Sequence, residues 1–151
     1  MALMGFAFTK FDATRLSSPK GKITINHDIK IEDLKYANVQ GHGQTNNGLL
    51  VEFSYTISYK PSIGKIRLEG NFIDIIDNSK EVADEYKKNK EMPLELREQY
   101  YNLINSKSLV KSIFLSEQVG LPSPINMPKL KFNKPEESDD KASESPKSTK
   151  K

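Results

Sequence analysis

Cysteine is absent from this chain of 151 residues, and histidine occurs only twice, as His27 and His42. Without cysteine the chain has no disulfide, no thiolate metal ligand and no cysteine nucleophile, which agrees with a reducing compartment. Zinc needs several nitrogen or sulfur ligands that converge, and two histidines do not supply such a set. We therefore expect no metal site, with one histidine facing a sheet and the other facing solvent.

Long apolar runs are also absent. No stretch approaches the roughly 20 residues that cross a bilayer. The first ten residues, MALMGFAFTK, have neither the basic start nor the small-residue cleavage pattern of a signal peptide. We expect a cytoplasmic protein that does not insert into membranes.

The motifs that mark common enzyme sites are missing as well. The sequence has neither a P-loop nor a dinucleotide-binding glycine motif, and its serines lack a GxSxG context. Asp74 and Asp77 could pair as acid and base, but Asp77 fits equally well as a turn residue before a helix. We expect a protein that is not an enzyme, with no catalytic residues and no cofactor.

Neither sign of charge is in large excess, because 23 basic and 20 acidic residues leave a net charge of only +3. A dedicated nucleic-acid-binding protein concentrates its basic residues more strongly, whereas here they are scattered. We interpret them as solvated surface charge, with a weak polyanion-binding surface as the alternative.

The end of the chain differs from the rest in composition. Residues 133–151 hold five lysines, five acidic residues and no aliphatic residue larger than alanine. Such a segment cannot bury enough surface to offset the entropy of ordering it. We predict one domain over residues 1–132 and a disordered charged tail over residues 133–151.

What the chain does have is alternation. In residues 49–59, LLVEFSYTISY, apolar side chains take every odd position, which predicts a strand with one apolar and one polar face. Weaker alternation predicts an edge strand over residues 5–15 and another strand over residues 21–34. Residues 60–64, KPSIG, predict a turn in which glycine takes positive φ, and residues 65–76 predict a returning strand.

Glycines refine this picture at two places. Residues 40–48, QGHGQTNNG, have a composition typical of a mobile loop between two strands. In the returning strand the apolar residues begin on even positions and continue as Ile73, Ile75 and Ile76. The buried face is therefore expected to change near Gly70, where a glycine often marks a bulge.

Two helices are expected after the strands. Asn78 can cap a helix over residues 79–90, with Glu81 as its capping-box partner. A second helix is expected over residues 93–119, because that stretch opens on proline and is followed by Gly120.

The second helix carries an apolar stripe on one face. Its members are Leu96, Tyr100, Leu103, Ile104, Val110, Ile113 and Phe114. About 26 residues at 1.5 Å each make about 39 Å, which is long for a domain of this size. We therefore expect a break around residues 105–106.

Residues 121–130 cannot be helical, since three prolines recur within them. The segment also contains apolar residues, so it is expected to lie extended against the body, with Ile125 and Met127 as anchors.

Together these elements predict an α+β fold, a twisted antiparallel β-sheet of about four strands with helices packed on one face. The aromatic residues of the central strands and of the helical stripe suit a core. The alternative is that surplus apolar surface stays open as a binding groove or a subunit interface.

Three parts of the sequence, one of them a pair of stretches, resemble the SecB protein-export chaperone. They are the opening GFAFTKFDATR, the pair VEFSYTISY and IRLEGNFIDI, and the closing VGLPSPINMPKLKF. The order of elements is also similar to that of SecB. A closer resemblance is to a family of small archaeal SecB-like proteins with an opening like GFAFTK, a central IRLEG and a closing LPSPINMPKL.

The SecB resemblance implies an ATP-independent holdase that binds unfolded or preprotein polypeptides, with protein export as a possible context and a homo-oligomer as its form. For the groove that holds an extended client, the residues expected to bind peptide are Tyr55, Tyr59, Phe72, Tyr100 and Phe114. Strand addition at a sheet edge is a further way to hold such a client.

A rival hypothesis is an RNA- or ribosome-associated accessory protein. Its phosphate contacts would be Lys60, Lys65, Arg67, Lys129 and Lys131. Salt separates the two hypotheses, because phosphate contacts weaken steeply with salt and apolar contacts do not. An antitoxin-linked chaperone is a third possibility.

Overall fold

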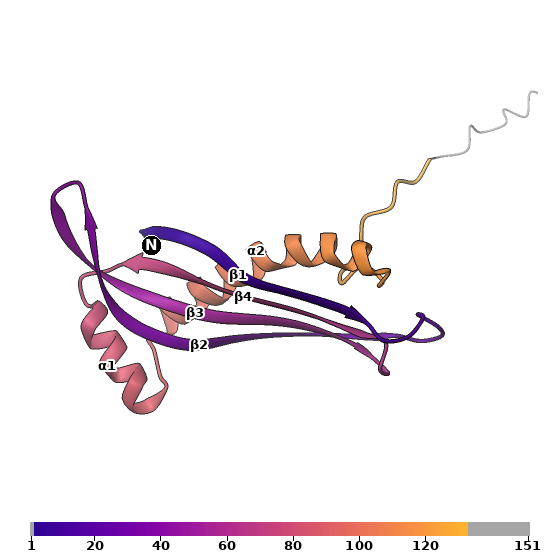
Figure 1. The fold of residues 1–151 in the computed structure, drawn as a ribbon, viewed down its shortest axis with the longest axis horizontal. Coiled ribbons are helices and arrows are strands. Elements are labelled where there is room, and N and C mark those ends of the chain that lie inside the picture. Colours follow the sequence, from indigo (N-terminus) through magenta and orange to yellow (C-terminus); the bar gives the residue numbers. More distant parts are fainter. Residues whose placement is uncertain (1, 133–151) are drawn as a thin grey trace, which may run out of the picture.

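A computed structural model describes residues 2–132 and shows two layers, an antiparallel sheet and two helices that share one buried core with it (Figure 1). The strands are β1 (Leu3–Arg15), β2 (Thr24–Gly41), β3 (Gln44–Lys60) and β4 (Gly64–Ile75), and the helices are α1 (Ser79–Asn89) and α2 (Leu94–Val119). The strand order is β1-β4-β3-β2. The predicted α+β fold is confirmed, whereas the predicted tail, residues 133–151, lies outside the described residues.

The central hairpin of β3 and β4 supplies most of the buried face. The odd positions of β3 from Leu49 to Tyr59 are all buried, as the alternation predicted. In β4 the even positions are buried from Gly64 to Asp74 without interruption, and the pairing with β3 runs continuously. The expected change of face near Gly70 is therefore wrong.

The irregularity lies instead in β1, which carries two register shifts against β4, one just after Met4 and one just after Phe8. A Cβ at Gly70 would lie 2.5 Å from the carbonyl oxygen of Ala7 and 2.7 Å from Cζ of Phe53. Since such distances are too short for a side chain, glycine is needed here for the close approach of β1 and the phenylalanine ring.

β2 and β3 continue past the rest of the sheet as a two-stranded arm, at the left of Figure 1. The loop expected over residues 40–48 is wrong, because strand pairing continues until only His42 and Gly43 remain in the turn. Both have positive φ, 49° and 78°, which is the geometry of a two-residue hairpin turn. β4 ends opposite Gly48, so β3 pairs with β2 alone over residues 44–47.

The turn between β3 and β4 lies where it was predicted, but its glycine, Gly64, does not take the expected positive φ. Ser62, and not Gly64, has a positive φ of 47°. A Cβ at Gly64 would lie 2.7 Å from both Cδ2 of Leu121 and the carbonyl oxygen of Thr14. The missing side chain lets β1 and the segment after α2 approach β4 closely.

α1 begins after Asn78, as predicted, but Asn78 makes no side-chain capping hydrogen bond, so the expected capping box with Glu81 is wrong. Packing holds this helix in place. Val82 is buried in the core, and the hydroxyl of Tyr86, also buried, donates to the carbonyl oxygen of Ile31 at 3.0 Å. α1 thereby covers the β2 side of the sheet.

α2 is one continuous helix of 26 residues, so the expected break around residues 105–106 is wrong. It ends at Gly120, which has a φ of 73° and donates its backbone N–H back into the last turn, as predicted. Figure 1 shows it running along the sheet. Within residues 2–132, no helix is both long and apolar enough to span a membrane.

The side of α2 that faces the sheet changes along the helix. Its buried residues recur every four positions, at Tyr100, Ile104, Ser108, Ser112 and Ser116. Two large side chains are thus followed by three serines. The predicted apolar stripe faces the core only in the first half of the helix, and Val110 and Phe114 are 66% and 59% exposed.

Candidate functional site

The structure separates the five residues expected to bind peptide into two groups. Tyr55, Tyr59, Phe72 and Tyr100 are at most 1% exposed, whereas Phe114 is largely exposed. A polypeptide on the surface of this structure cannot touch the first four. Their part in binding stays a prediction, and their observed contacts are those of core residues.

The buried tyrosine hydroxyls have specific partners. That of Tyr55 lies 2.9 Å from Nδ1 of His27, and that of Tyr59 donates to the carbonyl oxygen of Pro122 at 2.8 Å. Burial raises the pKa of Tyr55 and of Tyr59 to about 12. Both hydroxyls therefore keep their protons at neutral pH and can donate.

A buried carboxylate joins three parts of the fold. Asp74, at the end of β4, is fully buried. It accepts hydrogen bonds from the hydroxyl of Tyr100 on α2 at 2.7 Å and from the backbone N–H of Ala2 at 3.1 Å. Asp77 is exposed, so the two carboxylates that the sequence suggested as an acid and base pair are divided between core and solvent.

Several large apolar side chains of β1 and α2 are exposed. We define the β1–α2 surface by Phe11, which is 49% exposed, and by the exposed Val110 and Phe114. Half-buried Phe6 and Phe8 continue it along β1, since the rings of Phe6 and Phe8 are 5.4 Å apart and those of Phe8 and Phe11 are 5.3 Å apart.

Two contacts fix how α2 runs along β1. Nζ of Lys107 lies 5.9 Å from the ring centroid of Phe6, and Gly120 lies beside the guanidinium group of Arg15. The two elements therefore run in the same direction, and between these two contacts lie Phe114 on α2 and Phe11 on β1. Residues at spacings of three and seven share a helix face, so Val110 and Phe114 lie on the Lys107 side of α2.

The β1–α2 surface adjoins a free sheet edge. In the described part of the chain, β1 is the outer strand, and its residues 10–15 pair regularly with β4 on one side only. Backbone groups on the other side of this stretch are available to an additional strand. The sequence predicts Val110 in the core and Phe11 only in an edge strand. The spacing of apolar residues along a helix does not show which of them remain exposed to solvent.

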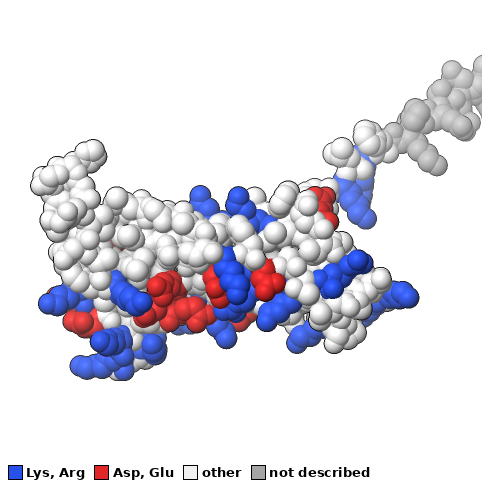
Figure 2. Space-filling model, in the orientation of Figure 1, with Lys and Arg blue, Asp and Glu red and all other residues white. Residues whose placement is uncertain are grey.

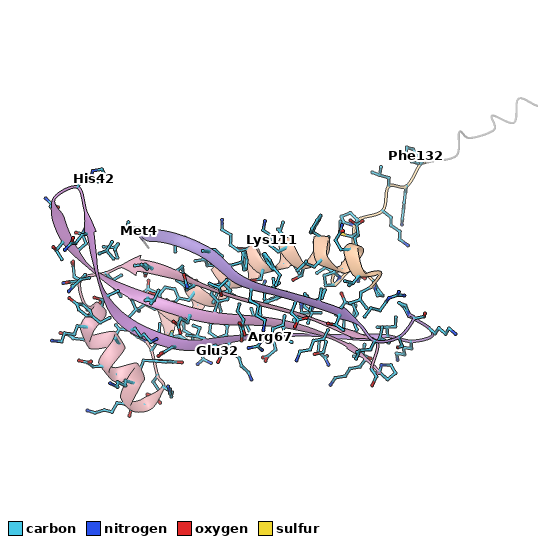
Figure 3. The ribbon with its side chains drawn as sticks, viewed as in Figure 1. Met4, Glu32, His42, Arg67, Lys111 and Phe132 are labelled. Carbon is cyan, nitrogen blue, oxygen red and sulfur yellow. The ribbon has the colours of Figure 1, made fainter. Side chains whose placement is uncertain are left out.

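The opposite face of the sheet is polar, and neither helix covers it within residues 2–132. Figure 2 shows lysine and arginine side chains intermixed with acidic ones over its centre, and Figure 3 shows Glu32 and Arg67 close together there. Nη2 of Arg67 lies 3.0 Å from Glu69 and 3.8 Å from Glu32. The charges on this face largely neutralise one another.

The ion pairs of Arg67 concern the five residues suggested for phosphate contact, because Arg67 is one of them. Arg67 is engaged by two carboxylates, and Lys60 and Lys65 lie at the far end of the β3–β4 hairpin. Lys129 and Lys131 are exposed on a segment that leaves the body (Figure 1). The structure does not gather these five residues into one basic patch, and phosphate binding by them stays a prediction.

Within residues 2–132 no three histidine, aspartate or glutamate side chains are grouped in a way that could hold a metal ion. His27 has a different role. Its Nε2 lies 3.0 Å from the carbonyl oxygen of Pro124, while its Nδ1 faces Tyr55. Nothing in the residues around His27 predicts that it holds the segment after α2.

Comparison with known proteins agrees with the architecture. No protein-family model and no curated protein sequence matches the chain. Among solved structures, it is similar to the Mycobacterium tuberculosis SecB-like chaperone Rv1957, solved in complex with a ChAD peptide from the HigA1 antitoxin. The TM-score is 0.51 at 10% sequence identity, over 87% of this chain and 91% of that one. The four-stranded antiparallel sheet and its two helices thus form a SecB-like α+β fold.

Proposed function

We propose that this protein is a chaperone that holds unfolded polypeptides, and that a client lies along the β1–α2 surface. The observation that carries the proposal is the exposure of Phe11 on the outer strand β1 and of Val110 and Phe114 on the helix that runs along it. An extended polypeptide can add to such an edge through its backbone while aromatic side chains contact its apolar residues.

Two further points support a chaperone. The structurally similar SecB-like protein was solved in complex with a peptide, so this fold can present a peptide-binding surface. The sequence has no P-loop, and we propose that binding needs no ATP. A cytoplasmic location, membership of the archaeal SecB-like family and a role in export remain our predictions.

Aggregation of a denatured client tests the proposal directly. A chemically unfolded enzyme is diluted into buffer with or without the protein, without nucleotide, and light scattering is followed. We expect suppression near a stoichiometric ratio that persists at high salt. Phe114→Asp should weaken client affinity at least about tenfold, because burying an aromatic side chain is worth about 1.5 to 3 kcal/mol.

Leu94 provides a matched control. It is also a large apolar residue of α2 and is 69% exposed, but it lies in the first turn, away from Phe114. Leu94→Asp should leave protection unchanged. Equal protection by both variants would contradict the proposed surface, and no protection by the wild-type protein would contradict the chaperone itself.

We also propose that the protein self-associates through the unpaired β1 edge and the adjacent β1–α2 surface. A second copy would cover the same apolar side chains that a client covers. Sedimentation should therefore show a larger species for the wild type than for Phe114→Asp, and an added client should compete with self-association. An unchanged sedimentation coefficient in Phe114→Asp would place any assembly elsewhere.

The phosphate-binding rival makes the opposite salt prediction. RNA or ribosome binding through lysines should fall steeply with salt. Co-sedimentation with ribosomes that disappears at moderate salt, together with unaffected client aggregation, would favour that rival.

A further inference from the structure

The segment that follows α2 is bound to the sheet as a ligand would be. Leu121 is 6% exposed and its side chain packs against Gly64. The carbonyl oxygen of Pro122 accepts from the Tyr59 hydroxyl at 2.8 Å, and that of Pro124 lies 3.0 Å from Nε2 of His27. We call the sheet residues His27, Tyr59 and Gly64 the segment site.

These contacts do not depend on the identity of most bound side chains. Both hydrogen bonds go to backbone carbonyl oxygens, which every residue has. Proline contributes its fixed φ and needs no partner for a backbone N–H. One apolar side chain, at Leu121, fills the space that Gly64 leaves. A different extended polypeptide with an apolar residue and prolines at similar positions satisfies the same site.

The side chains of this segment become more exposed from its beginning to its end. Pro124 is buried and Ile125 half-buried, but Met127 is 52% exposed and both Leu130 and Phe132 are 86% exposed. Figure 3 shows Phe132 pointing into solvent, away from the body. The sequence-based expectation that Met127 anchors the segment is therefore wrong, and the anchored part is limited to residues 121–125.

The segment site also adjoins the β1–α2 surface. Gly120, which precedes the segment, lies beside Arg15 at the end of β1. The next residue, Leu16, is 68% exposed and donates its backbone N–H to the carbonyl oxygen of Ile63 at 2.8 Å. A polypeptide lying along β1 reaches the segment site at the end of that strand.

We propose that the segment site is a second polypeptide-binding site. Residues 121–124 occupy it in the free protein and compete with a client, which displaces them with an extended apolar and proline-containing segment. This inference rests on the proposed function. It adds a second place where a client is held and a reason why the site is closed in the free protein, because an intramolecular occupant is present at high effective concentration.

The test uses the full chain and a fluorescent peptide with the sequence of residues 119–132 as probe. Leu121→Ala removes the apolar anchor of the intramolecular segment and leaves the sheet unchanged. Fluorescence anisotropy should then show at least tenfold tighter peptide binding than in the wild type. Leu130→Ala, in the exposed part of the same segment, is the matched control and should bind the peptide like the wild type.

A second substitution tests the location. Adding Tyr59→Phe to Leu121→Ala removes the hydroxyl that donates to the peptide carbonyl oxygen, and binding should weaken about two- to tenfold, as expected for one hydrogen bond. If Leu121→Ala lowers the melting temperature too far, Pro124→Gly loosens the segment by backbone entropy instead and should also increase peptide binding.

The outcomes separate the two proposals. Equal peptide affinity in the wild type, Leu121→Ala and Pro124→Gly, or an affinity insensitive to Tyr59→Phe, overturns the segment site. Sedimentation showing that Leu121→Ala exchanges segments between copies without taking up the peptide also overturns it. Peptide binding that follows the expected order, without any protection of a denatured client, leaves the segment site standing and refutes the holdase function.

Discussion

The substitution Tyr100→Phe isolates the hydrogen bond that joins α2 to the end of β4. It removes only the hydroxyl, which donates to Oδ2 of Asp74 at 2.7 Å. The ring remains and keeps its edge-on contact with Phe72, at 5.2 Å between centroids. Asp74 is fully buried, so no bulk water replaces the lost donor, and its other partner is the backbone N–H of Ala2 at 3.1 Å.

The magnitude follows from the charge and burial of the acceptor. Leaving a buried acceptor without one of its donors costs about 1 to 3 kcal/mol, and more when the acceptor is charged. Because Tyr100 is a neutral donor and the Ala2 amide remains, we expect a loss of about 2 to 3 kcal/mol in the free energy of unfolding. For a chain of this length that lowers Tm by roughly 5 to 10 °C.

Urea unfolding followed by circular dichroism measures this loss. Tyr101→Phe is the matched control, because Tyr101 is the next residue of α2, is only half-buried and contacts Arg97 through its ring. It should change stability by less than about 0.5 kcal/mol. A double-mutant cycle with Asp74→Asn should give a coupling energy above about 0.5 kcal/mol. No coupling, or a Tyr100→Phe variant as stable as the wild type, would refute the reasoning.

Three further predictions concern stability. Gly70→Ala places a Cβ within 2.5 Å of the β1 backbone, and urea unfolding should show a loss of about 1 to 3 kcal/mol. Leu121→Ala should lose about 2 to 5 kcal/mol, whereas Leu130→Ala, at an exposed position, should stay within about 0.5 kcal/mol in the same assay. Stability should also fall at alkaline pH, because burial raises the pKa of Tyr55 and Tyr59 to about 12 while unfolded tyrosine titrates near 10. Their contribution is fully present below about pH 10 and is lost as pH rises toward 12; a flat profile of the free energy of unfolding between pH 8 and 11.5 would contradict this assignment.

Features set by local chemistry could be predicted from the sequence. The alternation in β3 marks a half-buried strand because side chains point to opposite faces with a period of two. The bounds of α2 follow from Pro93 and Gly120, which act on the backbone next to them. Four strands and two helices in the right order were enough to predict the α+β fold.

Features set by partners distant in the sequence could not be predicted in this way. Gly70 was assigned to a bulge in its own strand, but the demand for glycine comes from Phe53 and from β1. The sequence predicts a loop over residues 40–48, where β2 and β3 form their arm, because asparagine, glutamine and glycine are typical of loops. Its pairing depends on a two-residue turn at His42 and Gly43, where a single positive-φ histidine gives little sequence signal.

The candidate site was misplaced for a related physical reason. An apolar stripe predicts that a helix packs, but a helix of 26 residues can turn one face to the sheet in its first half and another in its second. Residues four apart advance by 40° around the helix axis, since each residue turns about 100°. The buried line from Tyr100 to Ser116 therefore winds around α2 and leaves Val110 and Phe114 outside. Serines on the buried side let the second half of the helix lie close to the sheet, while Leu115 and Val119 pack against the edge of the core and Val110 and Phe114 remain exposed.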